Sequence, residues 1–211
     1  MSPADARVVH PALAAEAAGS LAELASSACR CVACPDLVAG RSRVVPGAFP
    51  PQAPVLFVGE APGAQEDISG QPFVGKAGQL LDQLLAEVGL SRARAAVTNV
   101  VKCRPPGNRT PRRSEVGNCR SWLDRQIELL QPAVVCTLGG TATSWALGPG
   151  TRLGQVRGAA LPWRDRLLVA TYHPSAAIRF GPAGAPLAAL RVDLRTVADL
   201  VERLESGRET D

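Results

Sequence analysis

The chain has 211 residues, of which 46% are hydrophobic and 4% aromatic, and its formal net charge is +4. This length is sufficient to bury one sizeable core, so we expect one globular domain. No run of eighteen apolar residues occurs, and the N-terminus has neither a basic start nor a long apolar stretch, which argues against a membrane span and a secretion signal. We therefore expect a cytoplasmic protein with no membrane partner.

The first half of the chain alternates predicted helices and strands. An Ala- and Leu-rich segment with a helical period at 11–28 predicts a helix within an N-terminal extension, residues 1–28. The short apolar run at 55–58 predicts a buried strand, because such runs are typical of parallel sheets covered on both faces. Leucines at helical spacing predict a helix over 76–88, and the apolar run at 95–101 predicts a second strand.

The second half continues this alternation and ends in a long helix. Its predicted elements, in chain order, are a helix that opens at Ser114 and stops before Pro132, a strand at 133–138, a short helix at 141–147, two runs around 158–163 and 167–172 that form a hairpin, and a helix at 186–205. Alternating strands and helices predict a three-layer α/β/α fold with a mainly parallel central sheet. We place the domain at 29–205 and a short tail at 206–211.

Three conspicuous segments follow predicted strands. They are GEAPG at 59–63, the pair Thr98 and Asn99, and YHPS at 172–175. Sites in mainly parallel α/β folds cluster at the carboxyl ends of the strands. We therefore expect these segments to contribute to one site.

Four of the six cysteines form two pairs about seventy residues apart, Cys31 with Cys34 and Cys103 with Cys119. Because disulfides are rare in proteins without a secretion signal, we interpret these cysteines as thiolate ligands of one metal centre. Such a centre would close a long loop and pin the N-terminal arm to the middle of the domain.

The cysteine spacing alone does not separate zinc from an iron–sulfur cluster, since both accept four thiolates. Fifteen residues separate Cys103 from Cys119 and resemble no zinc knuckle, which favours a [4Fe-4S] cluster. Cys29 is an alternative ligand to Cys31. Cys136 lies in an apolar run, where a free cysteine is typically a small buried hydrophobic residue.

The loop after Cys103 carries four arginines, Arg104, Arg109, Arg112 and Arg113. Their Pro, Gly, Asn and Thr neighbours indicate a loop rather than a helix face. Such a loop is either a solvated surface segment or a contact for nucleic-acid phosphates.

Five motifs together resemble the family-four uracil-DNA glycosylases, the iron–sulfur branch of the uracil-DNA glycosylase superfamily. They are CVAC at 31–34, GEAPGAQED at 59–67, GQPFVGKAG at 70–78, TNVVKCRPPGNRTP at 98–111 with Cys119 after it, and HPSAAIR at 173–179. The resemblance implies a four-stranded parallel sheet between helices and a [4Fe-4S] cluster. It also implies hydrolysis of the bond between uracil and deoxyribose in DNA, which leaves an abasic site for base excision repair.

This reaction places positive charge on the sugar and negative charge on the uracil, so the site needs an anion stabiliser and a positioned water. The resemblance assigns the first role to His173, which would meet uracil O2 as charge develops there. It assigns contact with the water to Glu60, whose neighbour Ala61 stands where the best-known branch of the superfamily has an aspartate. Glu66 is a second candidate for the water.

Base recognition requires a flat apolar face and a polar group that reads the edge of the base. Phe73 resembles the stacking aromatic of the family. Asn99 is the predicted edge reader, because a carboxamide offers both a donor and an acceptor to uracil N3 and O4. Asn108 is a further polar candidate or simply a turn residue, and Ala61 and His173 complete the predicted uracil pocket.

The remaining assignments concern DNA, because the nucleotide must leave the helix before its glycosidic bond can be reached. The resemblance suggests that Ile178 wedges into the base stack and Arg179 meets a phosphate, although helix-edge packing also explains an isoleucine there. Ser175, Arg109 and Arg112 are further predicted DNA contacts, through which the arginine loop would brace the backbone.

We expect a monomer whose partner is uracil-containing DNA, single- or double-stranded. One alternative is a sibling branch that captures uracil-DNA covalently through a histidine in a basic insertion, but no histidine lies between Cys103 and Cys119. Another is a zinc-stapled nucleic-acid-binding module without catalysis. The third is an α/β protein that binds a small ligand and ignores DNA.

Overall fold

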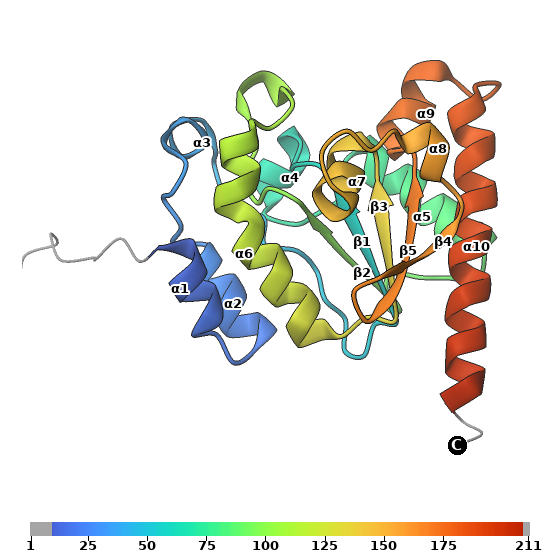
Figure 1. Cartoon of the computed structure of the whole chain (residues 1–211). Helices are drawn as coiled ribbons and strands as arrows, with labels where there is room; N and C mark the ends of the chain where they lie inside the picture. The colour runs from blue at the N-terminus through green and yellow to red at the C-terminus, as the bar shows by residue number, and fades with distance from the viewer. Residues whose placement is uncertain (1–9, 209–211) are drawn as a thin grey trace, which may run out of the picture.

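The computed structural model describes residues 10–208, and its centre is a sheet with the strand order β2-β1-β3-β5-β4 (Figure 1). The strands are β1 (Val55–Gly59), β2 (Ala95–Asn99), β3 (Val134–Leu138), β4 (Ala160–Trp163) and β5 (Arg166–Thr171). The first three and β5 run parallel, whereas β4 pairs antiparallel with β5. The expected mainly parallel sheet is confirmed. It has five strands rather than the four that the resemblance implied, because the predicted hairpin adds β4 at one edge.

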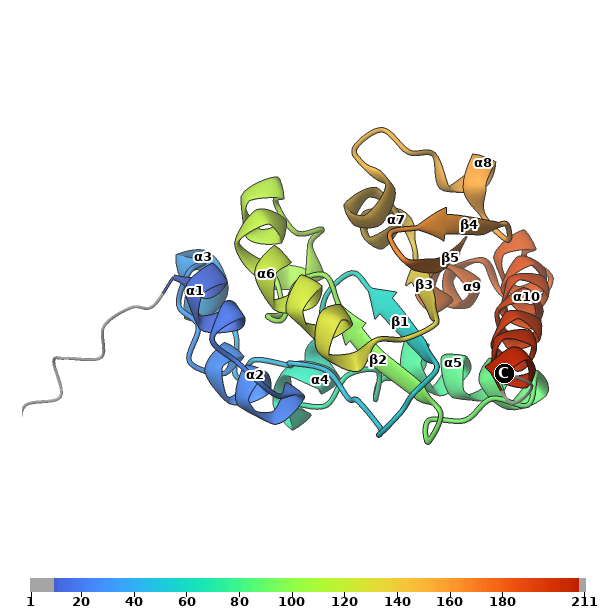
Figure 2. The ribbon, with the colours of Figure 1, turned by 60° about the horizontal axis from the view of Figure 1, so that its bottom comes forward.

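Helices cover both faces of the sheet (Figure 2). One face packs against α5 (Lys76–Glu87), α9 (Pro174–Phe180) and α10 (Ala185–Arg208), and the other against α6 (Arg113–Leu130) and α7 (Gly140–Leu147). Alternate residues of β1 enter two cores, with Val55 and Phe57 on the first face and Leu56 and Val58 on the second. Burial on both faces explains why this strand is a continuous apolar run.

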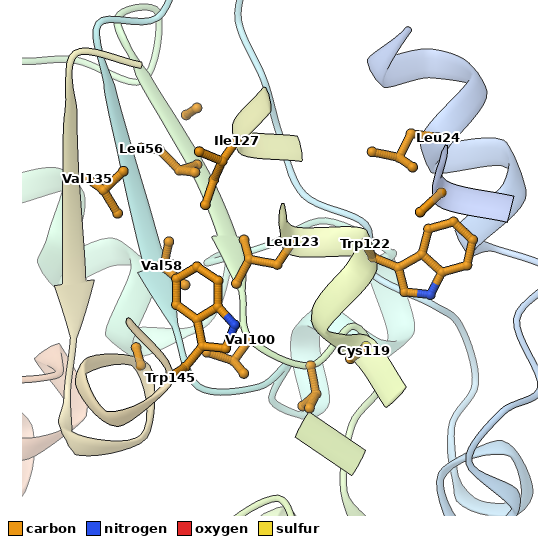
Figure 3. Close-up of a cluster of buried hydrophobic side chains, with 14 of the residues drawn as sticks. Leu24, Leu56, Val58, Val100, Cys119, Trp122, Leu123, Ile127, Val135 and Trp145 are labelled. Atoms are coloured by element: carbon orange, nitrogen blue, oxygen red, sulfur yellow. The ribbon is translucent and has the colours of Figure 1, made fainter. Parts of the chain in front are cut away.

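The N-terminal segment adds a further layer outside α6. It forms α1 (Pro11–Glu16) and α2 (Leu21–Ala28), and Figure 3 shows Trp122 of α6 facing Leu24 of α2 while Leu123 and Ile127 face the sheet. The prediction of one helix over 11–28 is wrong. The helix breaks before Ser20, whose hydroxyl caps α2 by accepting a hydrogen bond from the Glu23 N–H at 3.2 Å.

Several short helices were not predicted from the sequence. They are α3 (Pro35–Gly40), α4 (Ala64–Ser69), η1 (Pro106–Asn108), α8 (Leu153–Val156) and α9. No helix within residues 10–208 is both long and apolar enough to cross a membrane.

The outer strands differ in how their free sides are protected. Pro162 lies in β4, and a proline has no N–H to offer to another strand. On the opposite edge, Ala48 forms an antiparallel bridge with Val97 of β2 through two backbone hydrogen bonds of 2.9 Å. Both edges are therefore partly closed.

Candidate active site and cysteine centre

The carboxyl ends of β1, β2 and β5 open into one pocket of about 260 Å³. Nine of the twelve residues predicted to contact water, uracil or DNA line it: Glu60, Ala61, Glu66, Phe73, Asn99, Asn108, Arg109, His173 and Ser175. Arg112, Ile178 and Arg179 do not. The sheet topology thus brings together the three segments that follow predicted strands.

His173 is held as a neutral imidazole at the start of α9. Its Nδ1 accepts a hydrogen bond from the Ser175 N–H at 3.2 Å, and the Ser175 Oγ lies 2.8 Å from the same nitrogen. Because a nitrogen that accepts a backbone N–H carries no proton, the proton of the neutral ring lies on Nε2. Burial lowers the pKa of His173 from 6.5 to about 4, against the opposing effect of Glu66. At neutral pH the imidazole is therefore uncharged, and its Nε2–H can donate a hydrogen bond.

The two candidate glutamates have different environments. Glu66 accepts hydrogen bonds from three backbone N–H groups, those of Gly63 at 3.1 Å, Val74 at 2.9 Å and Gly75 at 2.8 Å. Its carboxylate thus bridges, through these hydrogen bonds, the two loops that carry Ala61 and Phe73. Glu60 accepts one hydrogen bond, from the Thr141 hydroxyl, and retains an oxygen without a protein partner among residues 10–208. The geometry favours Glu60 as the group that contacts the water.

Glu60→Gln and Glu66→Gln should therefore affect different properties. We expect Glu60→Gln to lower the single-turnover rate about 10²-fold or more with little change in stability. Glu66→Gln replaces one carboxylate oxygen by an NH2 group, which cannot accept the hydrogen bond of a backbone N–H. We therefore expect this variant to lose about 1–3 kcal/mol of stability. Single-turnover assays and thermal unfolding of both variants test this; equal destabilisation of the two variants would contradict the assignment.

Phe73 and Asn99 converge on Gly59 at the end of β1. A Cβ atom at Gly59 would lie 2.4 Å from Asn99 Oδ1 and 2.6 Å from Phe73 Cζ. The Arg92 guanidinium lies 5.8 Å above the Phe73 ring, and its Nη2 donates to the Phe73 carbonyl at 3.0 Å. The Asn99 carboxamide has no hydrogen-bond partner in the described part of the chain, although Asn99 is only 2% exposed. An aromatic ring and a carboxamide without a partner among residues 10–208 thus share one pocket.

Gly59→Ala should disturb both of these side chains at once. Forcing a methyl group into a packed site costs about 1–3 kcal/mol, and we expect the single-turnover rate to fall at least about tenfold. Gly117→Ala in α6 is the matched control, because its Cβ would meet no atom within 4 Å. The control should keep the wild-type rate; a Gly59→Ala variant that is equally active would show that the close approach is unimportant.

The predicted DNA contacts fall into two groups. Arg109 forms two hydrogen bonds with Glu115, at 2.8 and 2.6 Å, and Arg112 pairs with Asp36, so both already have carboxylate partners. Ile178 is 45% exposed on α9, which disfavours the helix-edge packing alternative. Phe180 on the same helix is 65% exposed, and sequence reasoning missed it.

Asn108 is also partly engaged, since its Oδ1 accepts from Arg104 Nε at 2.7 Å. Its backbone adopts the left-handed conformation, with φ 56°, which is typical of an Asn in a turn. Asn108 is thus a turn residue that also lines the pocket.

The two cysteine pairs come together beside this pocket. Cys34 packs against a buried cluster that contains Leu37, Val44 and Cys103. Burial raises the pKa of Cys103 to about 11, and the charges of Cys31 and Cys34 add to the rise. Burial likewise raises the pKa of Cys119 to about 12, with contributions from Cys103 and Cys31. Cys31, Cys34 and Cys119 thus each lie within electrostatic reach of Cys103.

Two cationic residues contact this group of sulfurs, Arg41 through its guanidinium and Lys102 through its backbone N–H, which donates to Cys119 Sγ at 3.3 Å. Arg41 Nη1 donates to Cys103 Sγ at 2.8 Å, and the fully buried Lys102 is adjacent to Cys103. Neither cation forms an ion pair with a carboxylate among residues 10–208. Over the same residues, no group of three or more His, Cys, Asp or Glu side chains is arranged to hold a metal ion. As predicted, Cys136 is buried in β3, whereas Cys29 is exposed.

The family model described as the uracil DNA glycosylase superfamily matches residues 46–194. The chain belongs to this superfamily. Among its relatives, the type-4 uracil-DNA glycosylases of Thermotoga maritima and Archaeoglobus fulgidus are 43% and 39% identical over 152 and 167 residues. These alignments cover 71% and 75% of this chain and 79% and 83% of the two relatives.

A type-5 uracil-DNA glycosylase of Pyrobaculum aerophilum is 35% identical over 183 residues, which cover 69% of this chain and 78% of the relative. The type-4 relatives are thus more similar, and the resemblance to the family-four branch is confirmed.

In this member of the superfamily, three residues beside the pocket had no assigned role from the sequence. Thr141 donates to Glu60, Arg92 contacts Phe73, and Lys102 contacts the backbone of Asn99. Lys102 alone had a local signal, since it is a charged residue between an apolar strand and a cysteine.

Proposed function

We propose that the protein is a uracil-DNA glycosylase that hydrolyses the N-glycosidic bond of deoxyuridine in DNA and acts in DNA repair. The pocket in which His173, Phe73 and Asn99 converge is the observation that carries this proposal. Membership of the superfamily and similarity to proteins named type-4 uracil-DNA glycosylases support it.

The proposed reaction is a displacement at C1′ of the sugar. The oxygen of a water bonds to C1′ as the bond from C1′ to N1 breaks, and the bonding electrons leave with the uracil. Negative charge then develops on O2, to which the His173 Nε2–H donates a hydrogen bond worth about 3–4 kcal/mol of barrier. Glu60 orients the water and accepts its proton, while Thr141 holds the carboxylate in place.

Asn99 supplies the selectivity for uracil. Its Oδ1 accepts from uracil N3–H and its Nδ2 donates to O4, whereas cytosine presents the opposite pattern. Phe73 stacks on the face of the base, a contact worth about 1–3 kcal/mol. Ala61 provides no carboxylate, so Glu60 is the acidic residue next to β1 that can contact the water.

Contact with DNA is proposed for the exposed end of α9 and the arginine loop. Ile178 fills the gap left by the extruded nucleotide, and Arg179, which is exposed, binds a phosphate. Arg112 remains exposed while it pairs with Asp36, so it can still approach the backbone. We propose that the protein acts on single- or double-stranded DNA as a monomer.

We also propose that Cys31, Cys34, Cys103 and Cys119 hold a [4Fe-4S] cluster. The donor set fits, because it consists of four thiols without a histidine. Arg41 and Lys102, two cations that have no carboxylate partner within residues 10–208, suit a group of negatively charged thiolates. When bound, the cluster would cross-link the segments that carry the proposed DNA contacts. Iron and sulfide analysis with a visible absorption spectrum separates it from zinc.

Release of free uracil from oligonucleotides that contain one deoxyuridine tests the enzymatic proposal. We expect release from single- or double-stranded substrate, an alkali-labile abasic site, and no cleavage of matched cytosine- or thymine-containing strands. An absence of release would contradict the proposal and favour a small-ligand pocket. DNA that remains attached after denaturation would instead indicate covalent capture.

A further inference from the structure

Lys102 is a buried lysine that connects the cysteine centre to the predicted base reader. It is 1% exposed, and its Nζ donates to the Asn99 carbonyl at 2.6 Å and to Thr98 Oγ1 at 2.9 Å. Its own N–H donates to Cys119 Sγ at 3.3 Å, and its carbonyl accepts from the Val45 N–H at 2.7 Å. Every polar group of this residue is therefore engaged, and the contacts reach both cysteine segments.

Burial of the Lys102 ammonium costs free energy unless the group is hydrogen-bonded within the protein. Burying a lysine removes its hydration, so hydrogen bonds must replace the lost water contacts. The pair of acceptors at the end of β2 does this, and it fixes the peptide from which the Asn99 side chain projects. Because the Asn99 carboxamide has no partner of its own in the described chain, its placement depends on this backbone.

A second set of contacts extends the connection to α6. Thr98 Oγ1 lies 3.0 Å from the Pro46 carbonyl, which also accepts from Gln126 Nε2 at 2.7 Å. Gln126 and Cys119 belong to the same helix. Lys102 thus lies where β2, the segment after the first cysteine pair, and α6 meet.

We propose that Lys102 is a positioning residue that sets the Asn99 carboxamide against the uracil edge and ties that placement to the cysteine segments. The proposal rests on the proposed glycosylase function and deepens it by naming what holds the specificity determinant. A merely structural lysine would affect folding, whereas a positioning lysine must act through Asn99.

A double-mutant cycle between Lys102→Met and Asn99→Ala tests this dependence. We expect Lys102→Met to keep its iron and to lower the single-turnover rate of uracil release about tenfold, as for loss of a charged hydrogen bond. In the Asn99→Ala background the same substitution should change the rate by less than about twofold. Equal losses in both backgrounds, or no loss in either, would overturn the proposal.

Thr98→Val provides a second test if Lys102→Met loses iron or does not fold. It removes one acceptor of the ammonium and keeps the charge and all cysteines. Thr137→Val in β3 is the matched control, because Thr137 is equally buried and its hydroxyl hydrogen-bonds, among residues 10–208, only to Thr143. A slower Thr98→Val with retained iron supports the proposal, and identical behaviour of the two variants overturns it.

The wild-type assay separates the two levels of inference. An inactive wild-type protein would overturn the proposed function and this proposal with it. An active wild-type protein with unaffected Lys102 and Thr98 variants would overturn this proposal alone.

Discussion

His173→Ala is expected to lower the single-turnover rate of uracil release by about 10²- to 10³-fold, the usual loss on removal of one preorganised donor. The Nε2–H of this residue is free to donate because Nδ1 is occupied by Ser175. His10→Ala is the matched control, since His10 is the other histidine and only caps α1. The control should retain the wild-type rate. A His173→Ala variant with more than about half of the activity would exclude this role.

The pH dependence of stability provides an independent test of the neutral imidazole. Burial lowers the pKa of His173 from 6.5 to about 4. Between these pH values the unfolded chain binds a proton here and the folded chain does not, so the free energy of unfolding should fall as the pH decreases through this window. Denaturant titrations at several pH values should show a weaker dependence in His173→Asn. Identical slopes for both proteins would contradict the assignment.

Cys119→Ala is expected to purify without iron and to unfold at a lower temperature. The cluster would close a loop between the N-terminal arm and α6, so its loss should cost at least about 2 kcal/mol, or ~4–8 °C for a chain of this size. Uracil release should also decline, because the loop after Cys103 lines the pocket through Pro105, Asn108 and Arg109. Iron analysis, thermal unfolding and the single-turnover assay measure these effects.

Two other cysteines provide the controls for this experiment. Cys29 is exposed, and Cys136 is buried in β3 on the sheet face opposite to Cys119. Cys29→Ala and Cys136→Ala should both retain iron, although the second loses some core packing. Iron loss in Cys29→Ala would make Cys29 a ligand, and a fully active, stable Cys119→Ala would remove the proposed structural role of the centre.

Long elements with a clear period were predictable from the sequence. The helices α5 and α10 were found because their apolar residues repeat over enough positions to define a face, and the strands β1 and β3 because each is a continuous apolar run. Helices of four to seven residues, such as α8 and α9, offer too few repeats. The break between α1 and α2 was missed because the Ala and Leu spacing continues across it, while Ser20 supplies a cap that only the structure reveals.

The residues that line the pocket were predictable from the sequence, whereas the contacts that hold their side chains in place were not. Asn99 ends β2, and Glu60 and His173 come just after β1 and β5, so the sheet topology alone brings them to one edge. The distinct environments of Glu60 and Glu66 depend on which backbone N–H groups fold towards each carboxylate, and no spacing in the sequence encodes that. The same holds for Thr141, which reaches Glu60 from a helix far along the chain.

The two partly closed edges of the sheet affect how readily the protein aggregates. An unpaired outer strand is a template on which another chain can add and begin aggregation. Here Pro162 interrupts the row of donors on one border, and Ala48 occupies the middle of the other. A second copy therefore meets no continuous ladder to extend, which disfavours aggregation through the edges of the sheet.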